Sequence, residues 1–249
     1  MSSERQLLNA KDPWWGEHVH RYNEVLPTLT KADIILDLAC GTGFGSDILA
    51  QHTDNRVIGG DIAEDAIKEC DLKWKRNNLS FKVLDGTKLS FPDGYFDKIV
   101  SFETIEHTTK FREMLQEFHR VLKPGGTAFI STPNFPVNSP TGKILNPYHS
   151  QEFTYAELRR ILENIFGDVK ITGQKYARYD GGKVNRFGKF VHWFFNIIGI
   201  RKFTPFAVKN RVSLFFTGKP FYPVPDDFLL VTDAKSILKC KTFFCICRK

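Results

Sequence analysis

The stretch that most constrains the fold of this 249-residue chain runs from Ile34 to Gly45. Its first residues, 34–38, form a short run rich in β-branched apolar side chains, which predicts a buried strand. The turn that follows contains Gly41 and Gly43, which lack the Cβ atoms that would hold a ligand away from the backbone. The residues after Gly45 have the composition of a helix. The sequence therefore predicts a strand, a glycine turn and a helix that together cradle a ligand.

Two common phosphate-binding motifs do not fit this turn. A P-loop closes with Gly-Lys-Ser/Thr, and no lysine lies between Lys31 and Lys68. A dinucleotide fingerprint needs Gly-x-Gly-x-x-Gly directly after the strand, and the spacing here is one residue short. An acidic residue, Asp37, also lies inside the end of the predicted strand.

Carboxylates follow the next three predicted strands. The second strand, 56–61, ends in Asp61, about 20 residues after the glycine turn, the spacing at which a carboxylate reaches ribose hydroxyls. The third, 79–84, ends at Asp85, and the fourth, 96–102, ends at Glu103. Because parallel strands end at one edge of a sheet, these groups are expected to line one crevice.

The motif from Asp37 to Gly43, Asp-Leu-Ala-Cys-Gly-Thr-Gly, resembles the first motif of the class I S-adenosylmethionine-dependent methyltransferases. The usual form is acidic-x-Gly-x-Gly-x-Gly, and Ala39 stands here at the first glycine. The phrase Arg-Val-Leu-Lys-Pro-Gly-Gly-Thr at 120–127 also resembles this family. The resemblance covers residues 17 to about 175.

The resemblance implies S-adenosylmethionine as cofactor and assigns residues to it. A helix at 13–29 is expected to cover the methionine end of the cofactor, where Arg21 could pair with the cofactor carboxylate; a surface helix packed on the body is the alternative. The residues predicted to line the cofactor site are Arg21, Asp37, Ala39, Gly41, Gly43, Asp61, Ile62, Asp85, Gly86, Phe102 and Glu103.

Strands that alternate with helices predict an α/β fold with a doubly wound, Rossmann-like sheet. The resemblance implies seven strands, mostly parallel, with an antiparallel last strand at 241–248 after a sixth at 168–172. We expect one methyltransferase domain over 1–249, with a basic, aromatic insertion at 174–240 before the last strand.

The net charge of +7 belongs to one end of the chain. Residues 1–169 carry a net charge of −5, whereas residues 170–249 carry +12. Phenylalanines are interleaved with basic residues at 186–221. The favoured interpretation is a small packed lobe, because phenylalanine is usually buried. The second is peripheral contact with an anionic membrane. A nucleic-acid surface is the least favoured interpretation. The apolar run at 191–200 is too short to span a bilayer.

The sequence predicts a cytoplasmic protein. The N-terminus lacks the apolar segment of a signal peptide, and the five cysteines are odd in number and lack paired zinc spacing. Membrane contact through 186–221 would place the protein at the inner face of the membrane. The sequence does not set the oligomeric state.

The loop at 132–150 is expected to lie over the crevice and to help choose the acceptor. Its Asn146-Pro-Tyr-His149 is similar to the Asn-Pro-Pro-Tyr of nucleic-acid amino-methylases, but it follows the fifth strand instead of the fourth. The segment 146–154 resembles bacterial methyltransferases associated with sugar and surface-glycan synthesis. This resemblance implies O-methylation of a sugar or glycan hydroxyl, which a lipid could carry.

Other functions stay open. A small hydrophobic acceptor such as a quinone precursor is the main alternative, and RNA or protein acceptors are less favoured. An NAD-dependent oxidoreductase would share the fold, and a non-catalytic binding module would be expected to have lost the carboxylates.

A hydroxyl acceptor needs a base, and histidine has a suitable pKa. His107, just after the fourth strand, is the first choice, and His149 on the loop is the second. His107 could instead orient its own loop through Glu103 or Glu106. No metal site is predicted, because His149 and Glu152 alone do not form a ligand set.

Overall fold

The computed structural model describes residues 14–177, 208, 211 and 223–249, which contacts within the chain divide into two compact units. The first comprises residues 21–175 and 230–249, and it carries the candidate site. The second comprises the described residues of 14–20 and 176–229. Most of the predicted insertion at 174–240, and of the predicted membrane contact at 186–221, lies outside the described residues. The domain boundaries therefore stay a prediction.

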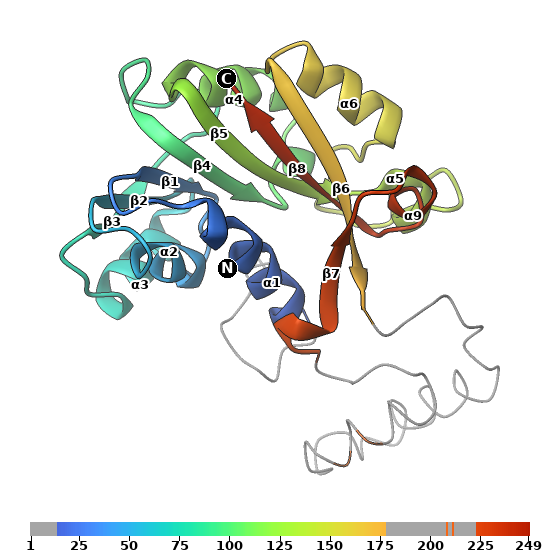
Figure 1. Ribbon diagram of the computed structural model, residues 1–249, viewed down its shortest axis with the longest axis horizontal. Coiled ribbons are helices and arrows are strands. Elements are labelled where there is room, and N and C mark those ends of the chain that lie inside the picture. The colour runs from blue at the N-terminus through green and yellow to red at the C-terminus, as the bar shows by residue number, and fades with distance from the viewer. Residues whose placement is uncertain (1–13, 178–207, 209–210, 212–222) are drawn as a thin grey trace. The chain divides into compact units, whose positions relative to one another are not determined.

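A sheet with the order β3-β2-β1-β4-β5-β8-β6-β7 organises the described chain (Figure 1). Its strands are β1 (Ile34–Leu38), β2 (Arg56–Asp61), β3 (Leu79–Val83), β4 (Phe96–Phe102), β5 (Leu122–Pro133), β6 (Asp168–Tyr176), β7 (Phe228–Val231) and β8 (Thr242–Arg248). The first five strands pair in parallel, and β8 is antiparallel to both β5 and β6. The doubly wound α/β fold and the antiparallel last strand are confirmed.

The prediction of seven strands is wrong, because the described sheet has eight. The additional strand is β7, whose four residues, Phe-Leu-Leu-Val, are all half-buried at the edge of the sheet. A run this short has no clear alternation of apolar and polar residues, so it could not be separated from the predicted insertion.

Helices connect the strands and cover the sheet. They are α1 (Trp15–Val25), α2 (Phe44–Ala50), α3 (Glu64–Lys73), α4 (Phe111–Val121), α5 (Phe135–Asn138), α6 (Tyr155–Glu163) and α9 (Ala234–Ile237), with 3₁₀ turns η1 (Leu26–Thr28), η2 (Ile105–His107) and η4 (Pro225–Asp227). The i, i+3, i+4 spacing of apolar residues on α4 buries one face of this helix in the main core, together with α6 and the central strands. Each such buried side chain contributes about 1.5–3 kcal/mol.

The strand order reverses between β1 and β4, which are neighbours in the sheet but not in the chain. In open α/β sheets a ligand crevice lies outside the carboxyl ends of the strands at such a reversal. The glycine turn follows β1, and Glu103 and η2 follow β4. The fold therefore brings the glycine turn and His107 to the same edge of the sheet.

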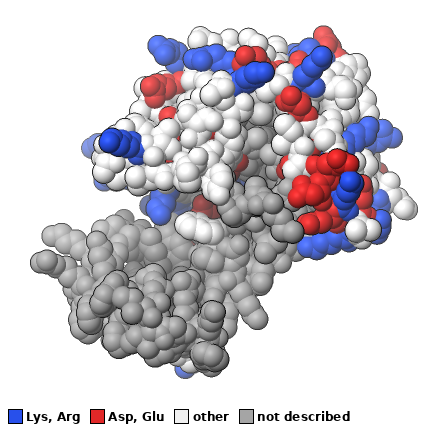
Figure 2. Space-filling model, turned by 180° about the vertical axis from the view of Figure 1, so that it is seen from behind, with Lys and Arg blue, Asp and Glu red and all other residues white. Residues whose placement is uncertain are grey.

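Figure 2 shows one face of the molecule, on which the lysine and arginine side chains of the described residues lie among aspartates and glutamates. Half of the sixteen lysine and arginine residues of 170–249 belong to the part of the chain outside the description. Among the described helices, none is both long and apolar enough to cross a membrane.

Candidate active site

The turn after β1 has a left-handed backbone at three positions: φ is 60° at Ala39, 54° at Gly41 and 74° at Gly43. A Cβ atom on Gly41 would meet nothing within 4 Å, so the backbone borders open space there. A Cβ atom on Gly43 would lie 2.8 Å from the Cys70 sulfur and 2.9 Å from the Phe81 ring. The missing side chain of Gly41 thus leaves room for a ligand, and that of Gly43 leaves room for the packed side chains of Cys70 and Phe81. Ala39 has a side chain, so its left-handed backbone costs roughly 1–2 kcal/mol.

Asp61, at the end of β2, lies directly beside the glycine turn. Its Oδ2 accepts a hydrogen bond from the Gly41 amide at 3.0 Å, and its Oδ1 accepts one from the Ala63 amide at 2.9 Å. The intervening residue, Ile62, is 72% exposed. The structure therefore brings together Asp61 and Gly41, as the spacing predicts, and leaves an apolar side chain next to them.

Asp85 and Gly86 follow β3. The exposed Asp85 carboxylate accepts hydrogen bonds from the amide and the hydroxyl of Thr87, which lower the pKa of Asp85. Gly86 is buried, and a Cβ atom there would lie 2.7 Å from the Leu38 side chain at the end of β1. This packing fixes the turn after β3 beside the end of β1.

Asp37 lies inside the protein. Its two carboxylate oxygens accept hydrogen bonds from Tyr22 Oη at 3.0 Å and from Ser46 Oγ at 2.6 Å, and the residue is 0% exposed. Burial raises the pKa of Asp37 to about 7, although both hydrogen bonds oppose the shift. Asp37 therefore ties α1 and α2 to β1 and supports the glycine turn from within.

Arg21 is also fully buried, and its positive charge lies 3.2 Å from Glu103. Its Nε donates to Gln174 at 2.8 Å, and Ser131 Oγ donates to Glu103 at 2.7 Å. Glu103 has a φ of 50°, a conformation that strains a residue with a side chain. The preceding Phe102 packs edge-on against a tyrosine of α1. The predicted pairing of Arg21 with a cofactor carboxylate stays a prediction.

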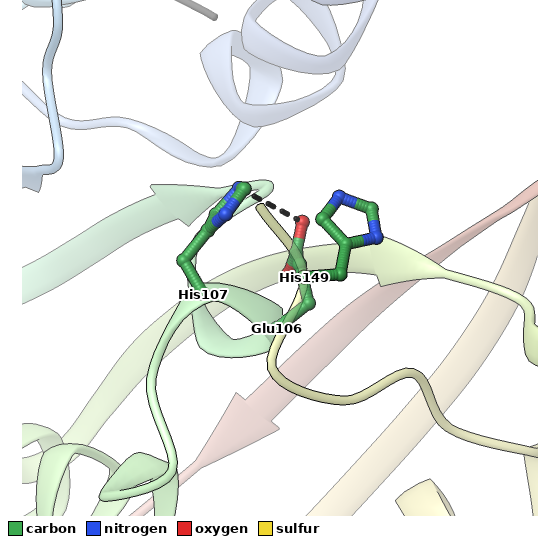
Figure 3. A group of neighbouring side chains, drawn as sticks. All are labelled: Glu106, His107 and His149. Carbon is green, nitrogen blue, oxygen red and sulfur yellow. Dashed lines mark ion pairs between the residues drawn. The ribbon is translucent and has the colours of Figure 1, made fainter. Parts of the chain in front are cut away.

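A second group of polar side chains gathers around η2 (Figure 3). Glu106, His107 and His149 offer potential ligand atoms that all lie within 4.8 Å of one another. His107 Nε2 lies 3.9 Å from Glu106 Oε1, and the centres of the two imidazole rings are 5.0 Å apart. The two histidines predicted from sequence are thus neighbours in the structure.

Glu106 is the member of this group that is not among the predicted site residues, although it was considered as a group that could orient His107. Its carboxylate is 0% exposed, and its Oε2 accepts a hydrogen bond from Thr132 at 2.9 Å. Burial, followed by the charge of Glu103, raises the pKa of Glu106 well above its ordinary value. The signal in the sequence was weak, because a glutamate beside a histidine at a strand end is usually solvated.

The loop after β5 is attached to η2 by hydrogen bonds. The amides of Ser150 and Gln151 donate to the Glu106 carbonyl at 2.8 and 3.2 Å, and His107 Nδ1 lies 3.1 Å from the Tyr148 carbonyl. These contacts hold His149 beside His107. The end of this loop therefore lies beside η2, which follows β4.

Comparison with known proteins identifies the family. Residues 36–130, from β1 through most of β5, match the model of a methyltransferase domain. A protein of Mycolicibacterium smegmatis described as a probable S-adenosylmethionine-dependent methyltransferase is 32% identical over 175 residues, which are 69% of this chain and 66% of that protein. The chain belongs to the class I S-adenosylmethionine-dependent methyltransferases. S-adenosylmethionine is therefore its cofactor, as the sequence predicts.

Two further likenesses extend the comparison. The methyltransferase shares its fold with the YcgJ protein from Bacillus subtilis, at a TM-score of 0.62 and 18% identity over 93% of this chain and 99% of that chain. It is 30% identical over 163 residues to a 2-methyl-6-phytyl-1,4-hydroquinone methyltransferase of Synechocystis, a match that covers 52% of this chain and 51% of that protein. The methyltransferase spans less than two thirds of the length of either curated relative.

The residues around the turn of this methyltransferase fit the cofactor. Gly41 borders open space, and Asp61 holds a carboxylate at the adjacent backbone amide. A ribose carries hydroxyl donors that a carboxylate can accept, and a bare glycine backbone permits close approach. We accordingly take these residues as the part of the site that would hold the nucleoside.

Proposed function

We propose that the protein transfers a methyl group from S-adenosylmethionine to a hydroxyl of a sugar or glycan, which a lipid can carry. The observation that carries this proposal is the pair of imidazoles, His107 and His149, at the edge of the sheet where β1 ends in the glycine turn. A hydroxyl is a poor nucleophile at neutral pH, and a nearby imidazole can accept its proton.

The cofactor supplies, when bound, a methyl group on a positively charged sulfur. Asp61 would accept hydrogen bonds from the ribose hydroxyls, and Gly41 would admit the nucleoside to the backbone. Ile62 would cover the apolar face of the base, because its side chain is exposed beside Asp61. Together these residues would fix the position of the methyl group, which is most of what an in-line displacement requires of a protein.

We assign the role of proton acceptor, in the absence of a bound cation, to His107, which ends η2 directly after β4. A carbonyl oxygen only accepts hydrogen bonds, so His107 Nδ1 carries the proton at Tyr148 and Nε2 carries the lone pair. Nε2 of His149 already accepts a hydrogen bond from the Asn146 amide at 2.9 Å. His107 Nε2 would take the proton of the acceptor hydroxyl, and the bound cofactor would supply the methyl group that replaces this proton on the oxygen.

The chemistry of the acceptor is tested by incubating the full-length protein with methyl-labelled S-adenosylmethionine and two panels of acceptors. One panel holds free, nucleotide-linked and lipid-linked saccharides, and the other holds prenylated hydroquinones. We expect label on a saccharide hydroxyl, located by mass spectrometry of the product. Label on hydroquinones alone would contradict the sugar assignment.

A small hydrophobic acceptor such as a quinone precursor is the second candidate. The likeness to the Synechocystis hydroquinone methyltransferase supports it, although that match covers only about half of either chain. The two panels separate these candidates in one experiment.

A further inference from the structure

Glu106, His107 and His149 bring three potential ligand atoms together beside η2. The Tyr148 carbonyl takes the proton of His107 Nδ1, and the Glu152 carboxylate, 2.8 Å from His149 Nδ1, takes the proton of that ring. The lone pair of each imidazole is therefore on Nε2. Figure 3 shows the two rings on either side of the Glu106 carboxylate.

Glu106 Oε1 has no hydrogen-bond partner among the residues that the structure describes, and its side chain is fully buried. The other carboxylate oxygen is bound by Thr132. A buried carboxylate oxygen is costly unless a proton or a cation meets it. The geometry thus calls for a positively charged ligand between these three side chains.

We propose that Glu106, His107 and His149 bind a divalent first-row transition-metal cation such as Zn²⁺. Two imidazole nitrogens and one carboxylate oxygen are a donor set that such ions accept, and three protein ligands leave a coordination position for substrate or water. Ligand atoms around a tetrahedral ion lie about 3.4 Å apart, given bonds of about 2.1 Å. The cluster, now within 4.8 Å, would close on the ion by rotation of the half-exposed His107 side chain.

The surroundings of both histidines match what metal-binding imidazoles use. Each Nδ1 faces an oxygen acceptor, the Tyr148 carbonyl or the Glu152 carboxylate, and Glu152 is itself held by Ser139 Oγ at 2.8 Å. Such outer contacts fix the tautomer and the orientation of a ligand. The Asn146 amide, which donates to His149 Nε2, would turn aside when the cation binds.

The binding of the cation does not depend on the proposed function. Only the catalytic role of the cation rests on that function. With a cation bound, His107 Nε2 is a ligand and no longer a base. The cation would then lower the pKa of a hydroxyl at its open position, which is the usual way a metal ion activates such a group.

The test is calorimetry on the full-length protein after treatment with a chelator. We expect one Zn²⁺ per chain and no comparable binding of Mg²⁺, which prefers oxygen ligands. His149→Ala and Glu106→Gln should each weaken Zn²⁺ binding at least about tenfold, and Glu152→Gln about 10–100-fold. His52→Ala is the matched control, because His52 is an exposed histidine elsewhere, and it should leave Zn²⁺ binding unchanged.

Equal Zn²⁺ binding by the wild-type protein and the cluster variants would overturn the proposal, as would absence of binding to the wild type. Titration of each variant with S-adenosylhomocysteine reports whether it is folded. A variant that binds this nucleoside but has lost Zn²⁺ locates the metal site. Zn²⁺ binding by a wild-type protein that ignores S-adenosylhomocysteine would support the metal site and contradict the proposed function.

Discussion

The Asp61 carboxylate accepts a hydrogen bond from the backbone amide of Gly41 at 3.0 Å. This contact joins the ends of β2 and β1 and places a negative charge beside the one glycine of the turn whose missing side chain leaves open space. We take this relationship as the centre of the cofactor site.

Replacing Asp61 by asparagine should weaken binding of S-adenosylhomocysteine about 10–100-fold, because hydrogen bonds to a charged group contribute about 1.5–3 kcal/mol. Titration calorimetry measures the change. Asp54→Asn is the control, since that carboxylate is 75% exposed in a surface ion pair with Lys31 and should have no effect. Equal affinity of Asp61→Asn and wild type would remove Asp61 from the site.

The two glycines of the turn should respond differently to alanine. Gly43→Ala should lower the free energy of unfolding by about 1–3 kcal/mol because the new methyl group meets Cys70 and Phe81, and by roughly 1–2 kcal/mol more because its backbone is left-handed. Gly41→Ala should lower the free energy of unfolding by only roughly 1–2 kcal/mol, the cost of a left-handed backbone for a residue with a side chain. It should also reduce cofactor affinity, because the new methyl group enters the open space beside the turn. Denaturant unfolding and calorimetry separate the two effects. A Gly41→Ala variant with wild-type affinity would place the nucleoside elsewhere.

Asp37 should make stability depend on pH. Its pKa is about 7 in the folded protein, against an ordinary value of 3.8, so between about pH 4 and pH 7 only the folded state holds this proton. Stability should therefore fall as pH rises through that window, by up to about 4 kcal/mol in total. Asp37→Asn should remove this contribution. Denaturant unfolding at pH 4.5 and 7.5 checks it, and identical pH slopes for variant and wild type would contradict it.

His107→Ala should leave cofactor binding near normal and reduce turnover at least about tenfold, in keeping with the loss of a proton acceptor or of a ligand in the cluster. His52→Ala should retain full turnover. The assay is methyl transfer to the acceptor found in the labelling experiment. Unchanged turnover of His107→Ala would remove that histidine from the mechanism.

The local patterns of the chain sufficed to predict the central fold. The alternation of strands and helices predicted a parallel, doubly wound sheet, and Asp61 lies beside Gly41 as its spacing indicates. These features are local, because a strand, a turn and a helix follow one another in the chain.

Features that depend on contacts between residues far apart in the chain could not be predicted from the sequence. The burial of Arg21 and its pairing with Glu103 and Gln174 join residues from three elements. The convergence of Glu106 with His149 depends on how the loop after β5 returns to η2, which no periodicity records. The edge strand β7 is too short to carry a pattern.

The most direct test of the account is titration of the full-length protein with S-adenosylhomocysteine and, separately, with NAD. We predict saturable binding of S-adenosylhomocysteine, one per chain, and no heat of binding from NAD. Binding of NAD without binding of S-adenosylhomocysteine would contradict the assignment of this crevice to a sulfonium nucleoside.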